Sequence, residues 1–326
     1  MKTNAIRFHT TGSPDVLRWE EIDLDPPGAG EVLLRNVVIG VNMKEIGERQ
    51  GEYPCPPLPT VPGIEAAAVV VEVGPGVTEF KPGDRVCYAT VPTGSYCEQR
   101  VLPAERLIAL PDDISDELAA ATIHKGMTAR YLVRKTFPVS AGDTVLVHAA
   151  AGGTGSLVCQ WARHLGATVI GTVGSAHKAD YAYAHGCHHV INYSEEDFVA
   201  RVREITGGAG LPVVYDSVGH TTFTKSLECL GPFGLMVLYG IASGHPPPLE
   251  LMKFDIWKSY FYTRPSFFAH TKAREDLLAS AEDLFDVLRK GAVKVEIGGR
   301  FALRDAAAAH RKVESRSTIG PVLLFP

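Results

Sequence analysis

Paired cysteines are missing from this sequence. Its six cysteines are scattered, and none stands in a Cys-x-x-Cys pair. They are Cys55, Cys87, Cys97, Cys159, Cys187 and Cys229. Disulfide-stabilised secreted proteins usually carry paired, regularly spaced cysteines. We therefore expect a reduced chain located in the cytoplasm.

Long apolar runs and an excess of positive charge are also missing. No run of about 18 apolar residues occurs, and the opening MKTNAIRFHTTGSPDVLRW has no apolar core of signal-peptide length. We therefore expect neither a membrane span nor a signal peptide. The chain has 32 Lys and Arg against 37 Asp and Glu, a formal net charge of −5. This acidic balance argues against binding to nucleic acid or to an anionic membrane.

What is present falls into two regions of different character. Residues 1–125 contain short β-like runs, such as EVLLRNVVIGV, AAAVVVEVG and DRVCYA, separated by PPGAG, GPGV and KPGD. Closely spaced turn signals of this kind predict an all-β, partly barrel-like unit. From Asp143 onward, apolar runs alternate with helical segments, which predicts an α/β fold with a doubly wound parallel sheet.

The alternating region predicts individual elements. TVLVHA, ATVIGTV, HVINY, PVVYDSV and GLMVLYG are the expected strands. Helices are expected near residues 155–165 and 176–185 and within EEDFVARVREITGG and TTFTKSLECL. Gly186 and Gly207 stand where helices should end.

The end of the chain is too short to form a domain of its own. It carries one more amphipathic segment, residues 274–288, and two short β-like runs. We therefore expect domains at 1–125 and 126–262, with 263–326 returning to complete the first domain.

A glycine-rich loop stands between the first strand and the first helix of the alternating region. Its frame is Ala150-x-Gly152-x-x-Gly155, with Gly153 and Thr154 inside it. In a dinucleotide site the first small residue permits a tight turn, and the second lets the backbone approach a pyrophosphate. The third allows close helix–strand packing, and the helix N-terminus adds amide donors. We predict a dinucleotide site here; the alternative, a merely flexible turn, fits poorly because a helix follows at once.

The residues after the second strand of this region distinguish the two nicotinamide dinucleotides. An NAD site usually carries Asp or Glu about 20 residues past the glycine loop, bound to the ribose 2′-hydroxyl. Gly174 occupies that place, followed by Ser175 and Lys178. A charged hydrogen bond of about 1.5–3 kcal/mol to a 2′-phosphate gives a roughly ten- to hundredfold preference. We therefore predict NADPH as the cofactor; the alternative for Lys178 is a solvated lysine in the first helical turn.

Several segments, in order along nearly the whole chain, resemble one protein family. They are GVNMKEIGERQGEYP, GIEAAAVVVEVGPGVTEFKPGDRV, HKGMTARYL, VLVHAAAGGTGSLVCQWA, GTVGSAHK, VINY, VVYDSVG, YTRPS and SRSTIGPVLL. The chain resembles the zinc-free NADPH:quinone oxidoreductases of the zeta-crystallin type, within the medium-chain dehydrogenase/reductase superfamily. The resemblance implies a GroES-like catalytic domain, a Rossmann cofactor domain, an active cleft between them and a homodimer.

The ligands of zinc-dependent relatives are not in their places. A catalytic zinc takes about three protein ligands, mostly Cys and His. Where those relatives carry the first Cys, this chain has Asn42, and where they carry Gly-His-Glu it has GIE at 63–65. A structural-zinc lobe needs four closely spaced cysteines, and only Cys87 and Cys97 lie in that region. We therefore expect no metal site.

The resemblance also implies roles for individual residues. Asn42 and Tyr53 would face the nicotinamide and the substrate, and they are the catalytic candidates. Their alternatives are a turn-capping amide and a residue that covers a loop. Further cofactor contacts implied by the resemblance are Lys125, Thr128, Tyr193, Ser217, Gly219, Gly240, Ile241 and Arg264.

Four of these contacts carry specific expectations. Lys125 and Thr128, in HKGMTA, would begin the first helix of the cofactor domain; a solvated lysine and an N-terminal cap are the alternatives. Tyr193 would pack near the adenosine phosphate. Arg264 would reach the cofactor, with surface exposure as its alternative.

Two positions depart from the family pattern. Gly47 replaces a tyrosine that commonly lines the cleft, and Ile241 replaces an asparagine after the fifth strand. Both changes remove polar groups near the expected nicotinamide, and they leave the substrate open.

Without metal or flavin, a protein supplies position, desolvation and hydrogen bonds, while NADPH supplies the hydride. We expect a quinone as the acceptor, with a proton from solvent or from Tyr53. An α,β-unsaturated carbonyl compound (enone) is the alternative acceptor. A non-catalytic NADPH-binding protein, structural or RNA-binding, is the rival from another class, and the acidic balance disfavours RNA.

Overall fold

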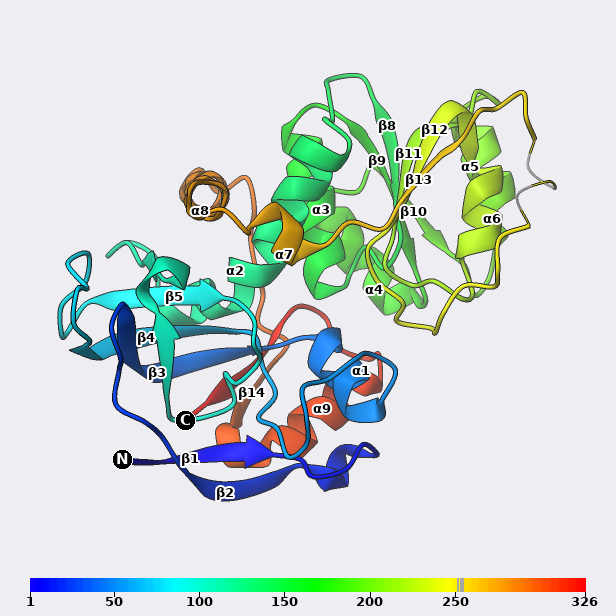
Figure 1. The fold of residues 1–326 in the computed structure, drawn as a ribbon. Helices are drawn as coiled ribbons and strands as arrows, with labels where there is room; N and C mark the ends of the chain where they lie inside the picture. The colour runs from blue at the N-terminus through cyan, green and yellow to red at the C-terminus, as the bar shows by residue number, and fades with distance from the viewer. Residues whose placement is uncertain (251, 253–254) are drawn as a thin grey trace. The chain divides into compact units, whose positions relative to one another are not determined.

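The computed structural model describes residues 1–250, 252 and 255–326. Contacts between Cα atoms group the chain into two compact units (Figure 1). The first unit comprises Met1–His124, Thr271–Glu282 and Val295–Pro326, and the second comprises Lys125–His270 and Asp283–Lys294. Helices α2 (Asp116–Tyr131) and α8 (Arg274–Arg289) contribute residues to both units.

The first unit contains a seven-stranded sheet in the order β14-β15-β3-β4-β5-β7, with β6 also paired to β3. Its strands are β3 Glu31–Val41, β4 Glu65–Val73, β5 Arg85–Ala89, β6 Gln99–Pro103, β7 Ile108–Ala109, β14 Gly299–Ala302 and β15 Val322–Phe325. All pairs are antiparallel except β14 with β15. A separate antiparallel hairpin joins β1 (Lys2–Arg7) to β2 (Arg18–Asp23). The end of the chain therefore completes the first sheet.

The core of the first unit follows from the composition of its long central strand. In β3, Val32, Leu34 and Ile39 are almost completely buried. They belong to one hydrophobic cluster with small residues of β4 and with Leu303 and Ala306 from the end of the chain. Two helices of this unit are α1 (Met43–Gln50) and α9 (Ala306–Glu314). Burial of β-branched and aliphatic side chains on a pleated surface stabilises this arrangement.

The second unit contains a parallel six-stranded sheet in the order β10-β9-β8-β11-β12-β13. Its strands are β8 Thr144–Val147, β9 Thr168–Val173, β10 His189–Asn192, β11 Leu211–Asp216, β12 Leu230–Leu238 and β13 Phe261–Thr263. The chain runs outward from β8 to β10 and then returns to β11 beside β8. In open parallel sheets, ligands bind at such a reversal, outside the carboxyl ends of the strands.

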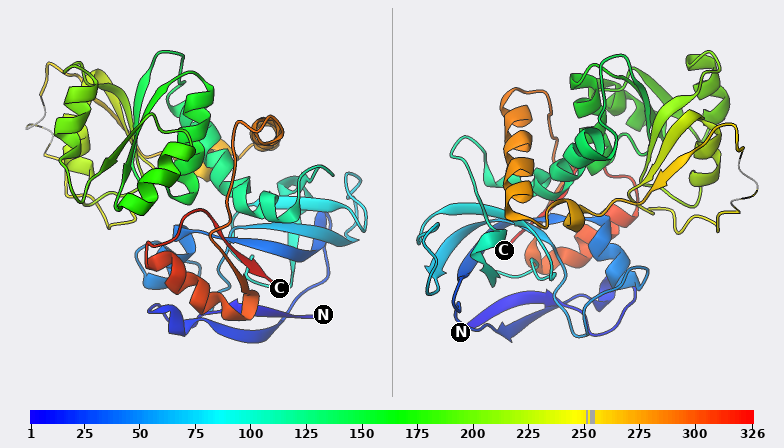
Figure 2. Two further views of the ribbon diagram at one scale, coloured as in Figure 1. Left: turned by 180° about the vertical axis from the view of Figure 1, so that it is seen from behind. Right: turned by 45° about the horizontal axis from the view of Figure 1, so that its top comes forward.

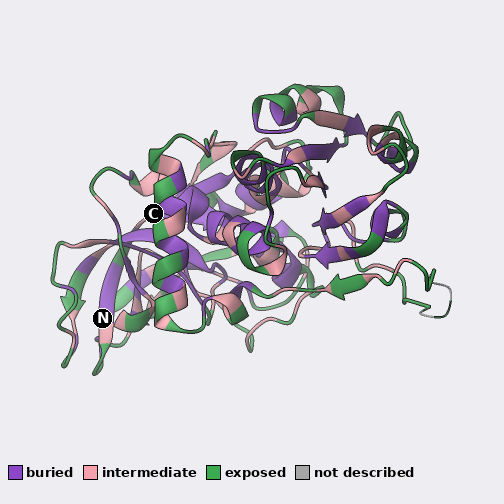
Figure 3. Cartoon of the chain, turned by 90° about the horizontal axis from the view of Figure 1, so that it is seen from above, coloured by how far each residue is buried: buried purple, intermediate pink, exposed green. Residues whose placement is uncertain are grey.

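Helices cover both faces of the parallel sheet. They are α3 Gly153–His164, α4 Ala176–Ala184, α5 Phe198–Ile205 and α6 Phe223–Glu228, followed by the short α7 Phe267–His270. Figures 1 and 2 show α3 on one face and α5 and α6 on the other. Figure 3 shows the resulting burial: the strands are mostly buried, and exposed residues gather on loops and outer helix faces.

The predicted architecture is confirmed in both units. The expected helix near 155–165 is α3, which begins two residues earlier, at Gly153, and the segment 274–288 is α8. The expected strands after residue 263 are β14 and β15. The structure groups residues 263–270 and 283–294 with the second unit. The domain bounds 1–125, 126–262 and 263–326 stay a prediction.

One expectation about local structure was wrong. Lys125 and Thr128 do not begin a helix, because α2 begins at Asp116 and both residues lie in its interior. Residues all around this helix are buried, among them Ala119, Ala121 and Ile123. The sequence analysis missed the local start signal of α2: Ser115 Oγ accepts from the Leu118 backbone N–H at 3.2 Å, and Asp116 and Glu117 lie in the first turn.

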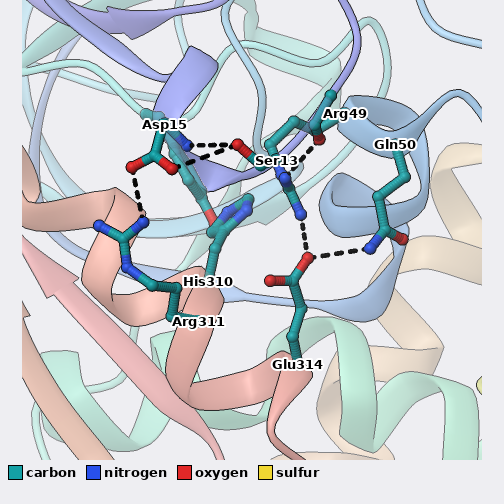
Figure 4. Close-up of polar contacts among 9 residues, drawn as sticks. Ser13, Asp15, Arg49, Gln50, His310, Arg311 and Glu314 are labelled. Carbon is teal, nitrogen blue, oxygen red and sulfur yellow. Dashed lines mark hydrogen bonds and ion pairs between the residues drawn. The ribbon is translucent and has the colours of Figure 1, made fainter.

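Helix α1 is tied to α9 by a buried arginine (Figure 4). The Arg49 side chain is fully buried; Nη1 donates to the carbonyl oxygen of Gly12 at 2.6 Å, and Nη2 pairs with Glu314. His310 Nε2 lies 3.1 Å from the Tyr96 hydroxyl, and burial lowers the pKa of His310 to about 3. The imidazole therefore stays neutral close to the buried guanidinium.

The Arg49–Glu314 pair predicts a large effect of one conservative substitution. In Glu314→Gln the buried guanidinium loses its charged partner, so we expect a loss of about 2–3 kcal/mol in the free energy of unfolding. This is below the usual cost for a fully buried pair because Glu314 is 22% exposed. Urea unfolding of both proteins measures the difference.

Glu21→Gln is the matched control, because Glu21 pairs with Lys2 on the surface and both side chains are more than half exposed. It should leave the midpoint of unfolding almost unchanged. Equal midpoints for Glu314→Gln and the control would contradict the anchoring role.

Candidate functional site

The glycine loop lies at the carboxyl end of β8, beside the reversal of strand order. Gly152 precedes α3 as its N-terminal cap residue, and Ala149 has a positive φ of 53°. A Cβ on Gly155 would lie 3.0 Å from the carbonyl carbon of Ala149 and closer still to its oxygen. Only glycine lets the helix approach the strand this closely, as predicted for the third small residue. The first turn of α3 therefore presents its amides next to a backbone without bulky side chains.

A buried histidine directly before the glycine loop forms hydrogen bonds to two neighbouring elements. His148 Nε2 lies 2.8 Å from Ser226 Oγ, and His148 Nδ1 lies 2.8 Å from Thr172 Oγ1. Ser226 Oγ donates its own proton to the Thr222 carbonyl at 2.9 Å, so it accepts from His148 Nε2–H. Burial lowers the pKa of His148, which keeps this tautomer neutral. The sequence analysis missed His148, whose position directly before the loop was its only signal.

The residues expected at the adenosine end lie together at the carboxyl ends of β9 and β10. Gly174 follows β9, Ser175 is the N-terminal cap residue of α4, and Lys178 lies in the first turn of α4 and is partly exposed. A Cβ on Gly174 would lie 2.7 Å from the Tyr193 hydroxyl oxygen. Tyr193 is 44% exposed. Glycine at 174 therefore makes room for the tyrosine, and the two positions form one surface.

Lys125 is brought to the glycine loop by α2. It is only 5% exposed, and a Cβ on Gly153 would lie 3.2 Å from its Cδ. The solvated-lysine alternative was therefore wrong. Thr128, one turn further along, is 6% exposed. Its position inside α2 also rules out the N-terminal cap.

The loops after β11 and β12 pack against each other. A Cβ on Gly240 would lie 2.9 Å from the Ser217 carbonyl oxygen, and one on Gly219 would lie 3.2 Å from Ile241 Cα. Gly219 has a φ of 86°, which favours glycine. Ile241 is 5% exposed. The four expected residues are thus brought together at the carboxyl edge of the sheet.

An aspartate that the sequence analysis missed shapes the loop after β11. Asp216 Oδ1 accepts from the backbone N–H groups of Val218 at 2.7 Å and Gly219 at 3.0 Å. Asp216 Oδ2 accepts from the Thr222 hydroxyl at 2.8 Å. An Asp at the end of a strand and before Ser-Val-Gly is the signal of such a turn. Arg264 follows β13 and is exposed, as its alternative stated.

Asn42 is the centre of a buried polar cluster in the first unit. Its Nδ2 donates to Glu65 Oε1 at 2.9 Å and to Glu45 Oε1 at 3.3 Å. Its Oδ1 lies 3.3 Å from His124 Nδ1, and the His124 backbone N–H donates to Glu65 Oε2 at 2.8 Å. Asn42 is 7% exposed, and Glu45 and Glu65 are fully buried. Both amide protons of Asn42 are therefore used, and Oδ1 is the atom that can accept a further hydrogen bond.

The same cluster fixes the start of α1. Asn42 is the N-terminal cap residue of α1, and its backbone N–H donates to Glu45 Oε2 at 2.9 Å. Asn42 is therefore a capping residue of α1, as its alternative stated. Burial raises the pKa of Glu45 to about 7, with smaller increases from Glu65 and Glu48 and a decrease from Lys44. The spacing Asn42-x-x-Glu45 is the sequence signal for the pair, because a capping box has this form.

Tyr53 lies against the same helix. It is partly exposed, and its ring contacts the Cα side of Gly47 in α1. The Tyr53 backbone N–H donates to the Gly47 carbonyl oxygen at 3.1 Å. Asn42 at the start of α1 and Tyr53 just after its end therefore both contact this helix in the first unit.

Among the described residues, no group of three or more His, Cys, Asp or Glu side chains is placed to hold a metal ion. In the same part of the chain, every helix is too short or too polar to cross a membrane.

Two family models match the sequence. The alcohol dehydrogenase GroES-like domain matches residues 28–136, and the zinc-binding dehydrogenase model matches residues 153–284. The first match covers β3 to β7 of the antiparallel sheet, and the second covers β9 to β13 of the parallel sheet.

Three proteins illustrate the similarity over the full chain. The 2-haloacrylate reductase of a Burkholderia species is 47% identical over 329 residues, which cover 99% of this chain and 98% of that protein. A quinone oxidoreductase of Pseudomonas aeruginosa is 45% identical over 321 residues, 98% of this chain and 99% of that protein. The structure of Escherichia coli quinone oxidoreductase complexed with NADPH has a TM-score of 0.96 at 43% identity, covering 99% of this chain and 100% of that one.

Proposed function

The chain belongs to the NADPH-dependent quinone oxidoreductase family of the medium-chain dehydrogenase/reductase superfamily, and from this premise we propose that it reduces a quinone. The observation that carries the proposal is the glycine-rich backbone between β8 and α3, together with Gly174, Ser175 and Lys178 at the end of β9, where an NAD site usually has Asp or Glu. A Cβ at Gly155 would meet the Ala149 carbonyl group, so glycine lets α3 begin directly at the end of β8, where its first amides can bind a diphosphate. Bound NADPH supplies the hydride, and the chain's residues supply position and hydrogen bonds.

The diphosphate site is built from the glycine loop. We assign the contacts to Ala150, Gly152, Gly153, Thr154 and Gly155, at the N-terminus of the 12-residue helix α3. The ammonium group of Lys125 adds positive charge, since its side chain lies along Gly153.

The adenosine end is assigned to the surface around Gly174. Ser175 and Lys178 would bind the 2′-phosphate, because a hydroxyl and an ammonium group are donors to its oxygens. The Tyr193 ring, packed over Gly174, would cover the adenosine. The remaining assigned contacts, which extend the site along the carboxyl edge of the sheet, are Thr128, Ser217, Gly219, Gly240, Ile241 and Arg264.

On the acceptor side we assign different roles to Asn42 and Tyr53. Asn42 already donates both amide protons to Glu45 and Glu65, so it serves as an acceptor through Oδ1. Tyr53 carries a hydroxyl that can donate a proton to the reduced acceptor. A conjugated acceptor suits such a site, because conjugation spreads the incoming negative charge without a Lewis acid.

A second candidate function is the reduction of the carbon–carbon double bond of α,β-unsaturated carbonyl compounds. The similarity to a 2-haloacrylate reductase over 99% of the chain supports it. Gly47 and Ile241 support it too, because each places a nonpolar residue where the quinone reductase pattern has a polar one. A non-catalytic role remains the rival, and a net charge of −5 disfavours RNA as the ligand.

The proposed 2′-phosphate contact predicts a change of cofactor preference. In Lys178→Ala we expect the ratio of kcat/KM for NADPH to that for NADH to fall about ten- to hundredfold, through loss of one charged hydrogen bond. Lys178→Arg should keep most of the preference. Lys312→Ala, on α9 of the first unit, is the control. An unchanged ratio in Lys178→Ala would refute the contact.

A panel of acceptors distinguishes the candidate functions. We expect NADPH oxidation with 1,4-benzoquinone, 9,10-phenanthrenequinone or simple enones, at rates that a metal chelator leaves unchanged. Fast quinone turnover supports the first candidate, and turnover confined to enones supports the second. Tight NADPH binding without turnover of any acceptor would favour the non-catalytic rival.

We also propose a cytoplasmic homodimer. The described cysteines are free thiols, five of them buried, which suits a reducing compartment. At the end of the parallel sheet, β13 exposes Phe261 (57%) and Tyr262 (48%), near Phe233 (70%). A second copy would cover this apolar edge by pairing with β13.

The proposed dimer predicts the mass in solution. Light scattering should give twice the mass of 35.1 kDa, and Phe261→Asp should shift the measured mass towards that of a single chain. A monomeric wild type contradicts the proposal.

A further inference from the structure

Helix α1 contains a glycine where a helix rarely tolerates one. Gly47 lies in the middle of Met43–Gln50, and it is buried. Glycine in a helix interior is less favourable than alanine because its backbone loses more conformational freedom. The position therefore calls for a structural reason.

The Tyr53 ring is that reason. A Cβ on Gly47 would lie 2.7 Å from Tyr53 Cε2 and nearer still to Cδ2, whereas real Cβ atoms essentially never approach within 3.0 Å. The ring edge thus occupies the space of the missing side chain. Any other residue at 47 forces the ring to move.

Backbone hydrogen bonds also restrict the position of the Tyr53 ring. The Gly47 carbonyl oxygen accepts from the N–H groups of both Glu52 and Tyr53, at 2.8 and 3.1 Å. Gly51 ends the helix with a φ of 82°, and the chain turns back at that point. Tyr53 is therefore held by its backbone and by its ring against the same residue, so the direction of its side chain is fixed.

We propose that Gly47 is a positioning residue that fixes the Tyr53 hydroxyl as the proton donor for alkene reduction, so that α,β-unsaturated carbonyl compounds are the preferred acceptors. This rests on the proposed function, in which Tyr53 meets the acceptor. It goes beyond that function by choosing between its two candidate substrate classes.

The chemistry of the two classes explains the choice. When the β-carbon of an enone accepts a hydride, the C=C electron pair moves towards the carbonyl oxygen and an enolate forms. The α-carbon then takes the Tyr53 proton, the C=O bond re-forms, and water reprotonates the tyrosinate; NADPH is oxidised to NADP⁺ and one proton is consumed. A quinone needs no such donor, because its reduced form takes protons on oxygen, where water exchanges them freely. A fixed hydroxyl therefore benefits the first class.

The test uses Gly47→Ala, Tyr53→Phe and the double variant, assayed with an α-methyl cyclic enone and with 1,4-benzoquinone. We expect kcat for the enone to fall about ten- to a hundredfold in each single variant, since misplacing a proton donor costs that much. The double variant should fall no further. With benzoquinone, we expect kcat to change less than about threefold, because the reduced quinone does not depend on the Tyr53 proton.

The stereochemistry of the product gives a second measurement. A fixed Tyr53 delivers its proton to one face of the α-carbon, so the wild type should yield mainly one enantiomer of the saturated ketone. In Gly47→Ala and Tyr53→Phe, water should protonate both faces and the enantiomeric excess should fall. A merely structural role of Gly47 would leave this excess unchanged.

Gly28→Ala is the matched control, because a Cβ there meets only the flexible end of Glu31, at 3.1 Å. Its kcat and enantiomeric excess should equal those of the wild type. NADPH binding and thermal unfolding of each variant show whether the protein remains folded.

Each other outcome contradicts the inference. Equal losses with both acceptors, or an unchanged enantiomeric excess in Gly47→Ala, would refute the positioning role. Quinone turnover without enone turnover would overturn the inference and leave the proposed function intact. If the wild type turned over neither acceptor, the proposed function would fail first.

Discussion

The candidate site in the second unit depends on the close approach of Gly155 to the Ala149 carbonyl group, where a Cβ would lie only 3.0 Å from the carbonyl carbon. This approach sets α3 directly on the end of β8, so the amides of its first turn point at the place where the strand order reverses. Other parts of the site follow from it. His148 links the loop to β9 and α6, and Lys125 lies along Gly153 because α2 packs beside the loop. If α3 lay further from β8, the contacts of His148 and Lys125 with the loop would be lost together.

The first unit holds its candidate residues by a different means, a network of buried charged groups. Asn42 is held between two buried carboxylates, and Arg49 ties the same helix to Glu314. Buried ionic groups cost desolvation, and that cost is tolerated only when their partners are in place. These contacts therefore fix helix α1 against the first sheet, and with it the positions of Asn42, Gly47 and Tyr53. The raised pKa of Glu45 follows from the same burial.

Neighbouring residues in the sequence are enough to predict some of these features. The glycine frame, the missing carboxylate near Gly174 and the alternating strands and helices depend on local spacing and period, which tertiary packing leaves intact. The doubly wound sheet follows as well, since right-handed crossovers leave few arrangements. The start of α2 was missed although Ser115, Asp116 and Glu117 form a local start signal, because the buried residues that follow show no amphipathic stripe.

Residue types and spacing alone determined the fold class, and they predict the dinucleotide loop and a cation at its adenosine end, because backbone approach and charge are properties of the residues present. Only the tertiary structure decided which distant side chains meet. Asn42, Glu65 and His124 are separated by 23 and 59 residues, and packing of α2 on the first sheet unites them. Gly47 looked like the simple loss of a tyrosine in the sequence. In the folded chain the Tyr53 ring fills the space that a side chain at Gly47 would occupy, because the turn at Gly51 brings residue 53 back against α1.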